Sequence, residues 1–222
     1  MHKESKQNEY ASVKTAIILP LLLACAVSSA QTVPPPSRPF EALTWSPSMK
    51  RQPSTGAKLG RLRIDFEKTT LAEILSNAEV GAIQHAGDAG ESVYWLCYTF
   101  SGLTPTRLWI VADGEMGGPE RAVTGITIAA LRSGQPVAGC PGLPLHLQPL
   151  SLKGDIRLGM YERAIVKMLG VPSHKGVDWI SYDFEGKAQG TCPSGFDVLN
   201  SLVLKTRQGT VDTIYASQVT SC

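Results

Sequence analysis

The residues with the clearest capacity for chemistry lie between positions 85 and 120. His85, Asp88 and Ser92 offer a base, an acid and a hydroxyl within one short stretch. A serine nucleophile usually stands on a tight turn such as G-x-S-x-G, with partners far away in sequence. Here Ser92 begins an alternating strand and that motif is absent. A small secreted hydrolase using residues 85–120 is therefore an alternative hypothesis, and we expect no catalytic residue.

Metal ligation is also weakly encoded. The same region is rich in acidic residues, namely Asp88, Glu91, Asp113, Glu115 and Glu120. A hard cation such as calcium requires several oxygen ligands at close spacing, but the loop pattern of an EF-hand is missing. His146 and His174 are single histidines on predicted loops, which favours surface positions. The sequence therefore predicts no metal and no cofactor.

The aromatic side chains on predicted strands are more informative. By alternation, one face of these strands carries Leu96, Tyr98, Phe100, Ile180, Tyr182 and Phe184, which we expect in the core. Trp95 and Trp179 then lie on the other face. Trp and Tyr on an open sheet are typical anchors of protein-binding surfaces. We predict a partner-binding surface of Trp95, Trp179, Tyr94 and Trp109; the alternative is that Trp95 and Trp179 pack together or under the N-terminal tail.

The elements that would position these residues occur twice. "WLCYTF" at 95–100 and "WISYDF" at 179–184 share Trp, Tyr and Phe in the same phase. Each follows a predicted helix, the first capped by Thr70 and Glu73 and the second, about 161–169, ended by Gly170. Each precedes a strand, a turn and a β-branched strand. The sequence therefore predicts an α+β fold of two tandem units, each with one or two short helices packed on an antiparallel sheet.

The predicted domain boundaries follow from this order. Residues 1–30 are a signal peptide, 31–58 a proline-rich flexible tether, 59–145 the first unit and 150–222 the second. Three apolar residues of the tether, Phe40, Leu43 and Trp45, are candidates for docking on the domain.

The N-terminus predicts export. Lys3, Lys6 and Lys14 precede an apolar stretch, residues 15–27, that is too short to span a bilayer. Small residues after it predict cleavage before Gln31. A second interpretation is a lipoprotein, because "LLAC" at 22–25 resembles a lipobox in which Cys25 would be lipidated. We expect a periplasmic or secreted protein, with an outer-membrane lipoprotein as the alternative.

Four cysteines remain after either cleavage: Cys97, Cys140, Cys192 and Cys222. In an exported chain they predict two disulfides, for which three connectivities exist. The repeated order favours Cys97–Cys140 and Cys192–Cys222.

The net charge gives no support to two kinds of partner, nucleic acids and anionic membranes. The chain carries +2, and removal of three Lys and two Glu with residues 1–30 leaves +1. This supports neither nucleic-acid binding nor strong attraction to anionic membranes. Membrane association would depend on a lipid anchor.

The second unit resembles a known family. "IRLGMYERAIVKMLGVPS" at 156–173 is similar to the opening of the BamE/SmpA family of small outer-membrane assembly lipoproteins, with matches at Ile156, Gly159, Met160, Val166, Leu169, Gly170 and Pro172. The resemblance implies a helical pair on a three-stranded antiparallel sheet. Two such units with a disulfide each look like the fold group of the β-lactamase inhibitory proteins, which implies protein binding through a concave aromatic sheet face.

These observations lead to one functional hypothesis. We expect an exported bacterial envelope protein that binds another protein without catalysis, as an inhibitor or an assembly factor. The alternatives are the small secreted hydrolase and a structural outer-membrane lipoprotein.

Overall fold

The computed structural model describes residues 32–39, 42, 44–88, 91–100, 104–114, 120–131, 139–152, 155–188 and 195–222. Residues 31–222 form one compact unit. Cys25, Glu115 and Cys192 lie outside the described residues, as do Phe40 and Leu43.

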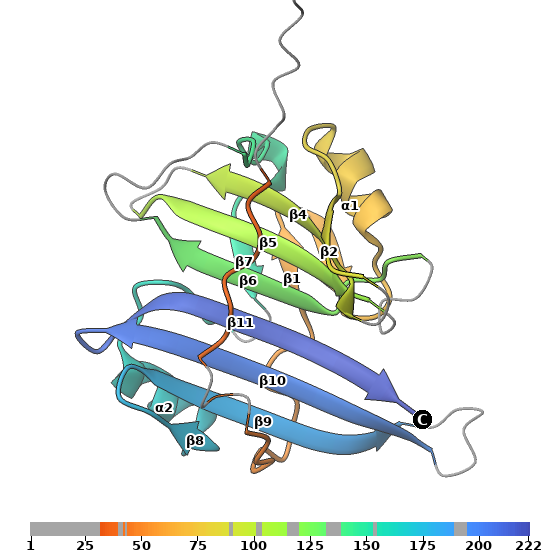
Figure 1. Ribbon diagram of the computed structural model, residues 1–222. Helices are drawn as coiled ribbons and strands as arrows, with labels where there is room; N and C mark the ends of the chain where they lie inside the picture. Colours follow the sequence, from red (N-terminus) through yellow and green to blue (C-terminus); the bar gives the residue numbers. More distant parts are fainter. Residues whose placement is uncertain are drawn as a thin grey trace, which may run out of the picture. The chain divides into compact units, whose positions relative to one another are not determined.

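An eight-stranded antiparallel sheet organises this unit (Figure 1). Its strands, in spatial order, are β3 (Gln84–Ala86), β4 (Val93–Phe100), β5 (Thr106–Asp113), β6 (Gly125–Ala130), β11 (Thr210–Ser221), β10 (Phe196–Arg207), β9 (Trp179–Ala188) and β8 (His174–Lys175). A three-stranded sheet has the order β2 (Leu62–Asp65), β1 (Gly56–Leu59) and β7 (Leu150–Leu152). The helices are α1 (Leu71–Ala78), α2 (Glu162–Leu169) and the 3-10 helix η4 (Leu145–Leu147). The coarse prediction of an α+β fold is confirmed.

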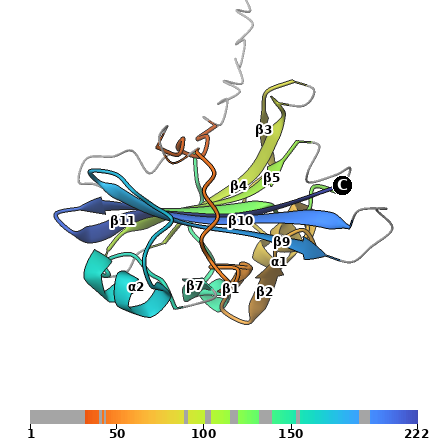
Figure 2. The ribbon, with the colours of Figure 1, turned by 90° about the horizontal axis from the view of Figure 1, so that it is seen from below.

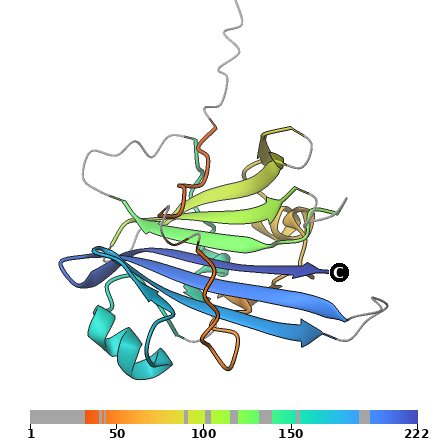
Figure 3. The ribbon, with the colours of Figure 1, turned by 60° about the horizontal axis from the view of Figure 1, so that its bottom comes forward.

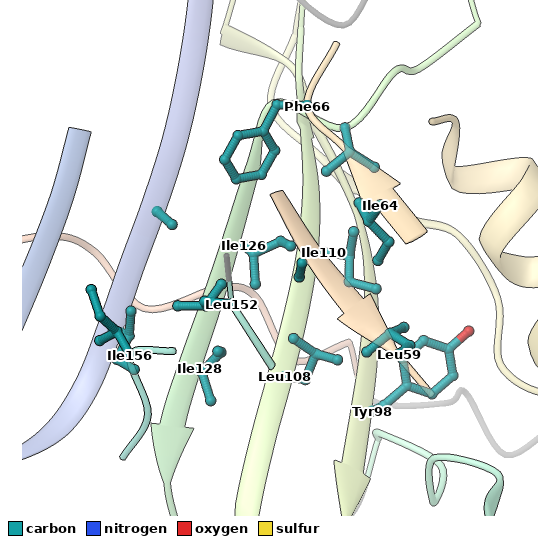
Figure 4. Close-up of a cluster of buried hydrophobic side chains, with 14 of the residues drawn as sticks. Leu59, Ile64, Phe66, Tyr98, Leu108, Ile110, Ile126, Ile128, Leu152 and Ile156 are labelled. Atoms are coloured by element: carbon teal, nitrogen blue, oxygen red, sulfur yellow. The ribbon is translucent and has the colours of Figure 1, made fainter. Parts of the chain in front are cut away.

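The small sheet and both helices lie on one face of the large sheet, which we call the inner face (Figure 2). Side chains from β5 and β6, including Leu108, Ile110, Ile126 and Ile128, meet Leu59 and Ile64 from the small sheet (Figure 4). All are buried, as the two-residue period of the strands predicts. The main core is therefore a layer between two sheets, closed at its ends by helices.

The two helices begin and end by different means. Thr70 accepts a hydrogen bond at Oγ1 from the Glu73 backbone N–H at 3.1 Å, which confirms the predicted N-cap of α1. Tyr161 precedes α2 without a side-chain cap. Gly170 ends α2 at φ 90°, a conformation that favours glycine.

Equivalent contacts recur in the two halves of the sheet. Tyr98 on β4 donates its hydroxyl to the Val80 carbonyl, just after α1, at 3.2 Å. Tyr182 on β9 donates to the Gly170 carbonyl, just after α2, also at 3.2 Å. Burial raises the pKa of both hydroxyls to about 12. The strand order is likewise mirrored about the β6–β11 pair.

Two details differ from the sequence-based expectations. Residues 59–66 alternate in sequence as a single strand would, but Gly60 and Arg61 form a turn between β1 and β2. The turn requires a φ of 57° at Gly60, a left-handed conformation that glycine adopts without steric cost. The range 31–58, predicted as a flexible tether, contains most of β1 and further residues that pack on the large sheet. β1 also pairs with β7, across the predicted unit boundary.

The Glu67 side chain forms hydrogen bonds with the C-terminal end of strand β11. Its carboxylate accepts hydrogen bonds from the Gln218 side-chain amide at 2.7 Å and from the Thr220 backbone N–H and hydroxyl, both at 2.6 Å. Three donors therefore converge on one acidic side chain.

Replacing this side chain should loosen the end of β11. We expect Glu67→Ala to lower the free energy of unfolding by about 2 kcal/mol, because hydrogen bonds to charged acceptors are stronger than neutral ones. Urea denaturation measures the change. Glu120→Ala, at an exposed position before β6, is the matched control and should change stability by less than about 0.5 kcal/mol. Equal effects of the two substitutions would contradict this role.

Candidate functional site

The candidate site is the other face of the eight-stranded sheet, which we call the outer face. In the strand register, one row across it reads Cys97, Trp109, Thr127, Tyr215, Val203 and Ser181. A neighbouring row includes Trp95, Val111, Gly125, Ser217, Ser201 and Asp183. The outer face therefore combines aromatic side chains with short polar ones.

An aromatic cluster covers the β4–β5 end of this face. Trp95 is 1% exposed and Trp109 is 5% exposed, and both pack beside Cys97 and Cys140. These two cysteines form the predicted disulfide. Val33, from the N-terminal part of the described chain, packs against the same cluster.

A second cluster lies at the β9–β10 end. Trp179 is 5% exposed and packs with Val203, Tyr215 and Ala42. The indole of Trp179 lies so close to Gly176 that a Cβ atom at position 176 would collide with it. The absence of a side chain at Gly176 therefore leaves room for the indole.

A proline-rich segment joins the two clusters. We call residues 32–39 the strap; it is the red to orange trace that crosses the sheet in Figures 1 and 3. Trp109 donates its indole N–H to the Val33 carbonyl at 2.9 Å. Tyr215 donates its hydroxyl to the Ser37 carbonyl at 3.0 Å. The Val33 N–H donates to the side-chain carbonyl of Gln84 at 3.2 Å.

The chain then continues around the β9 edge to the inner face. The Ser48 and Met49 backbone N–H groups both donate to the Asp183 carbonyl, at 3.0 and 3.1 Å. On the inner face, Asn200 donates to the Ser54 carbonyl at 2.6 Å and accepts from the Ser54 N–H at 3.3 Å. Part of the exposed edge of β9 is thereby protected from pairing with another chain.

A cation of the strap interacts with two carboxylates of the sheet, Asp113 and Asp183. Arg38 donates its guanidinium to the Ser217 hydroxyl. Burial lowers the pKa of Arg38, while Asp113, Asp183 and Tyr215 raise it. Burial also raises the pKa of Asp183, and hydrogen bonds from Ser201 and Ser181, together with the charges of His174 and Arg38, act in the opposite direction.

The strap does not fill the outer face completely. A groove of about 240 Å³ lies between Pro35–Arg38 and the sheet, lined by residues that include Val111, Thr127 and Ser217. Within the described part of the chain, the Trp95 indole N–H is buried and has no hydrogen-bond partner. An unpaired buried donor costs about 1–3 kcal/mol. The covered face thus retains unused space and one unused donor.

The predicted partner-binding residues are not on an open surface. Trp95, Trp109 and Trp179 do lie on one face, but residues 32–39 and 42 cover them. This matches the alternative in which the tryptophans pack under the tail. Tyr94 lies on the inner side, where alternation along β4 places it against the main core. It stacks on His85 at 4.4 Å between ring centroids.

The other residues considered for chemistry are scattered. His85 is exposed on β3, and the Ser92 carbonyl accepts from the Gly114 N–H at 2.6 Å. His146 contacts the Asn77 carbonyl at 2.9 Å, on the surface of the first half. His174 lies beside Trp179. Asp88 lies between β3 and β4, and its backbone carbonyl accepts from the Glu91 N–H at 3.0 Å.

Only one cysteine of the second predicted disulfide, Cys222, lies among the described residues. Cys222 is disulfide-bonded. Its predicted partner, Cys192, lies outside the described residues, so the Cys192–Cys222 pairing stays a prediction.

Within the described ranges, no group of three or more His, Cys, Asp and Glu residues is placed to hold a metal ion. Among the helices that the structure describes, none has the length and apolarity needed to cross a membrane.

Sequence reasoning missed the polar half of the site. Arg38 and Gln84 make hydrogen bonds within the strap region, and the charge of Asp183 acts on Arg38, yet no sequence pattern gave any of the three a role. One usable signal was Arg38 itself, a single cation between prolines, in a segment otherwise suited to a solvated spacer.

No family model, curated protein or solved structure matches this chain.

The buried carboxyl of Asp183 gives the outer face a pH dependence. Because burial raises its pKa in the folded state, the folded protein binds this proton more readily than the unfolded chain. The contribution of Asp183 to stability therefore falls as the pH rises from about 4 toward neutrality. We expect Asp183→Asn to unfold at higher urea concentration than the wild type at pH 7, with a smaller difference at pH 4.

The matched control is Asp178→Asn, which changes an exposed carboxyl five positions earlier in the chain. This substitution should leave the dependence of stability on pH unchanged. A loss of stability in Asp183→Asn at pH 7 would mean that attraction to Arg38 outweighs the cost of burial.

Proposed function

We propose that this chain is an exported, non-enzymatic module of the bacterial envelope that binds another protein on the outer face of its sheet. The observation that carries the proposal is the strap itself. The outer face holds an extended segment through side-chain donors that bind backbone carbonyls at Val33 and Ser37. A surface that binds backbone groups accepts many sequences, as peptide-binding domains do.

The proposal includes a construction from two tandem units. Its support is the mirrored strand order and the matching bonds of Tyr98 and Tyr182 to the ends of α1 and α2. In the β6–β11 pair, at the centre of this order, Thr127 lies directly opposite Tyr215. Two units joined in this way give a continuous face broad enough for an extended partner.

A partner reaches the tryptophans only when the strap leaves. The described contacts of the strap with the sheet are a few hydrogen bonds and small apolar clusters. Terminal segments with few contacts open at low free-energy cost compared with core strands. An inhibitor or an assembly factor would both use such a face, and the predicted periplasmic or secreted location suits either role.

Site-specific photo-cross-linking in the producing cell tests this function. A photoreactive amino acid replaces Ala129, which packs against the outer aromatic cluster, and, as control, exposed Glu73 on α1. We expect adducts with one envelope or secreted protein from position 129, and none from position 73. The yield should increase when Arg38→Ala loosens the strap. Equal adduct patterns at both positions, or none at position 129 in the loosened chain, would contradict the proposal.

A further inference from the structure

The spacing of two hydrogen-bond donors, Trp109 and Tyr215, determines which backbone conformation the outer face can bind. Trp109 pairs across the sheet with Thr127, which pairs with Tyr215, so two strand spacings, about 10 Å, separate the donor residues. The carbonyls they bind, those of Val33 and Ser37, are four residues apart. Four residues span about 12 Å in polyproline II but about 6 Å in an α-helix. The spacing of the two donors therefore matches an extended segment better than a helix.

The composition of the occupant suits this spacing. Four of the eight strap residues are proline, including the three between Val33 and Ser37. Proline has no N–H and fixes φ near −65°, so these residues favour polyproline II and do not pair as a strand. Proline-rich ligands bind aromatic-lined grooves because little conformational entropy is lost on binding.

The surroundings of Arg38 suit a basic residue. Arg38 follows the bound Ser37 carbonyl and donates its guanidinium to the Ser217 hydroxyl, in a groove that Asp113 also lines. Burial lowers the pKa of Arg38, and the carboxylates of Asp113 and Asp183 act in the opposite direction. These carboxylates belong to strands β5 and β9, on opposite halves of the sheet. A basic residue one position after the second bound carbonyl would therefore reach a hydroxyl acceptor and lie near two carboxylates.

Two independent features indicate that the strap is an imperfect occupant. It leaves the groove of about 240 Å³ beneath Pro35–Arg38 unfilled. It also leaves the Trp95 indole N–H without a partner among the described residues. Trp95 lies opposite Val111, which lines that groove. A segment with larger side chains, or with a carbonyl opposite Trp95, would bind better.

We propose that the outer face is a recognition site for an extended, proline-containing segment of another protein with a basic residue at its C-terminal side, and that residues 32–39 occupy this site in cis. The inference rests on the proposed function and names the chemistry of its partner. A tethered strap acts at an effective concentration on the order of 1 mM. The foreign segment must therefore bind more tightly than the strap, or act on a chain whose strap is weakened.

Peptide titration of the full chain tests the proposal. The probe is a fluorescently labelled synthetic peptide with the sequence of residues 32–39, TVPPPSRP. It is titrated against the wild type, against Arg38→Ala and against the control Arg61→Ala, which removes an exposed cation far from the strap in sequence. We expect binding to Arg38→Ala at least about tenfold tighter than to the other two chains, because its own strap competes less.

Variant peptides test the chemistry. Replacing the four prolines of the probe by alanine should weaken binding to Arg38→Ala about tenfold or more, because each proline restricts the free peptide. Replacing its arginine by alanine should also weaken binding. Trp109→Phe in the same chain should reduce affinity, since it removes the donor to the first carbonyl. Near-UV circular dichroism of each variant shows whether its tertiary packing is retained.

The outcomes separate the two proposals. Absence of binding to correctly folded Arg38→Ala, or equal binding of the alanine peptide, would overturn the inferred ligand chemistry, even if cross-links from position 129 support protein binding. A concentration-dependent dimer in analytical ultracentrifugation that disappears in Arg38→Ala would assign the site to the strap of a second copy. That result would overturn the proposal of a foreign segment.

Discussion

Removing the Cys97–Cys140 disulfide by a double substitution to alanine should lower the free energy of unfolding by about 4 kcal/mol. The bond joins residues 43 positions apart, and the chain-entropy model assigns this amount to a loop of that size. The loop contains β5 and β6, so the unfolded chain gains freedom across the centre of the first half. Urea denaturation of the oxidised proteins measures the difference.

The same experiment has an internal control. Wild-type protein treated with a strong reductant loses its disulfides without any change of side chain, and it should lose at least as much stability as the double variant. A double variant that loses less than about 1 kcal/mol would show that the closed loop contributes little. The entropic explanation would then be wrong for this chain.

Truncation of Trp95 should have an effect of similar size. We expect Trp95→Ala to cost about 3–5 kcal/mol, because it removes a large side chain that is only 1% exposed and leaves a cavity beneath the strap. Thermal or urea unfolding measures the loss. The purpose of this substitution is to measure packing, since an unstable chain cannot report on partner binding.

Two conservative variants isolate the role of the indole N–H. Trp109→Phe removes the donor to the Val33 carbonyl, whereas Trp95→Phe removes a donor that has no partner among the described residues. We expect Trp109→Phe to be the more destabilising by about 1 kcal/mol. It should also raise the rate at which a protease cleaves within residues 32–39. A larger loss in Trp95→Phe would reveal a hydrogen bond between Trp95 and a group outside the described residues.

Local patterns carried most of the correct predictions. The alternation that assigns Tyr98 and Tyr182 to the core places both on the inner face, and the Thr70 cap and the Gly170 stop bound their helices. The order of elements around the cysteines was sufficient to predict the Cys97–Cys140 bond. These features depend on residues close in sequence, or on a period that a strand imposes regardless of its neighbours.

The covering of the outer face by the strap could not be predicted, because it depends on contacts between residues far apart in sequence. Ser37 and Tyr215 are 178 residues apart, and the strap has prolines in place of any periodic pattern. No propensity indicates which sheet face such a segment will cross. Tyr94 was misplaced for a simpler reason: adjacent residues of one strand face opposite sides, so Tyr94 and Trp95 cannot share a surface. Strict use of alternation would have separated them.

The span of the strap also sets an order of events during folding. Val33, Ser37 and Arg38 leave the ribosome before the rest of the domain, yet two of their contacts are with Tyr215 and Ser217 on the last strand. Contacts of such high sequence separation form late, because closing a long loop costs entropy before any contact repays it. Until β11 is in place, the tryptophans have no complete cover. The newly synthesised chain therefore passes through a period in which its aromatic face is open, and any segment able to occupy that face would meet it first in the nascent protein.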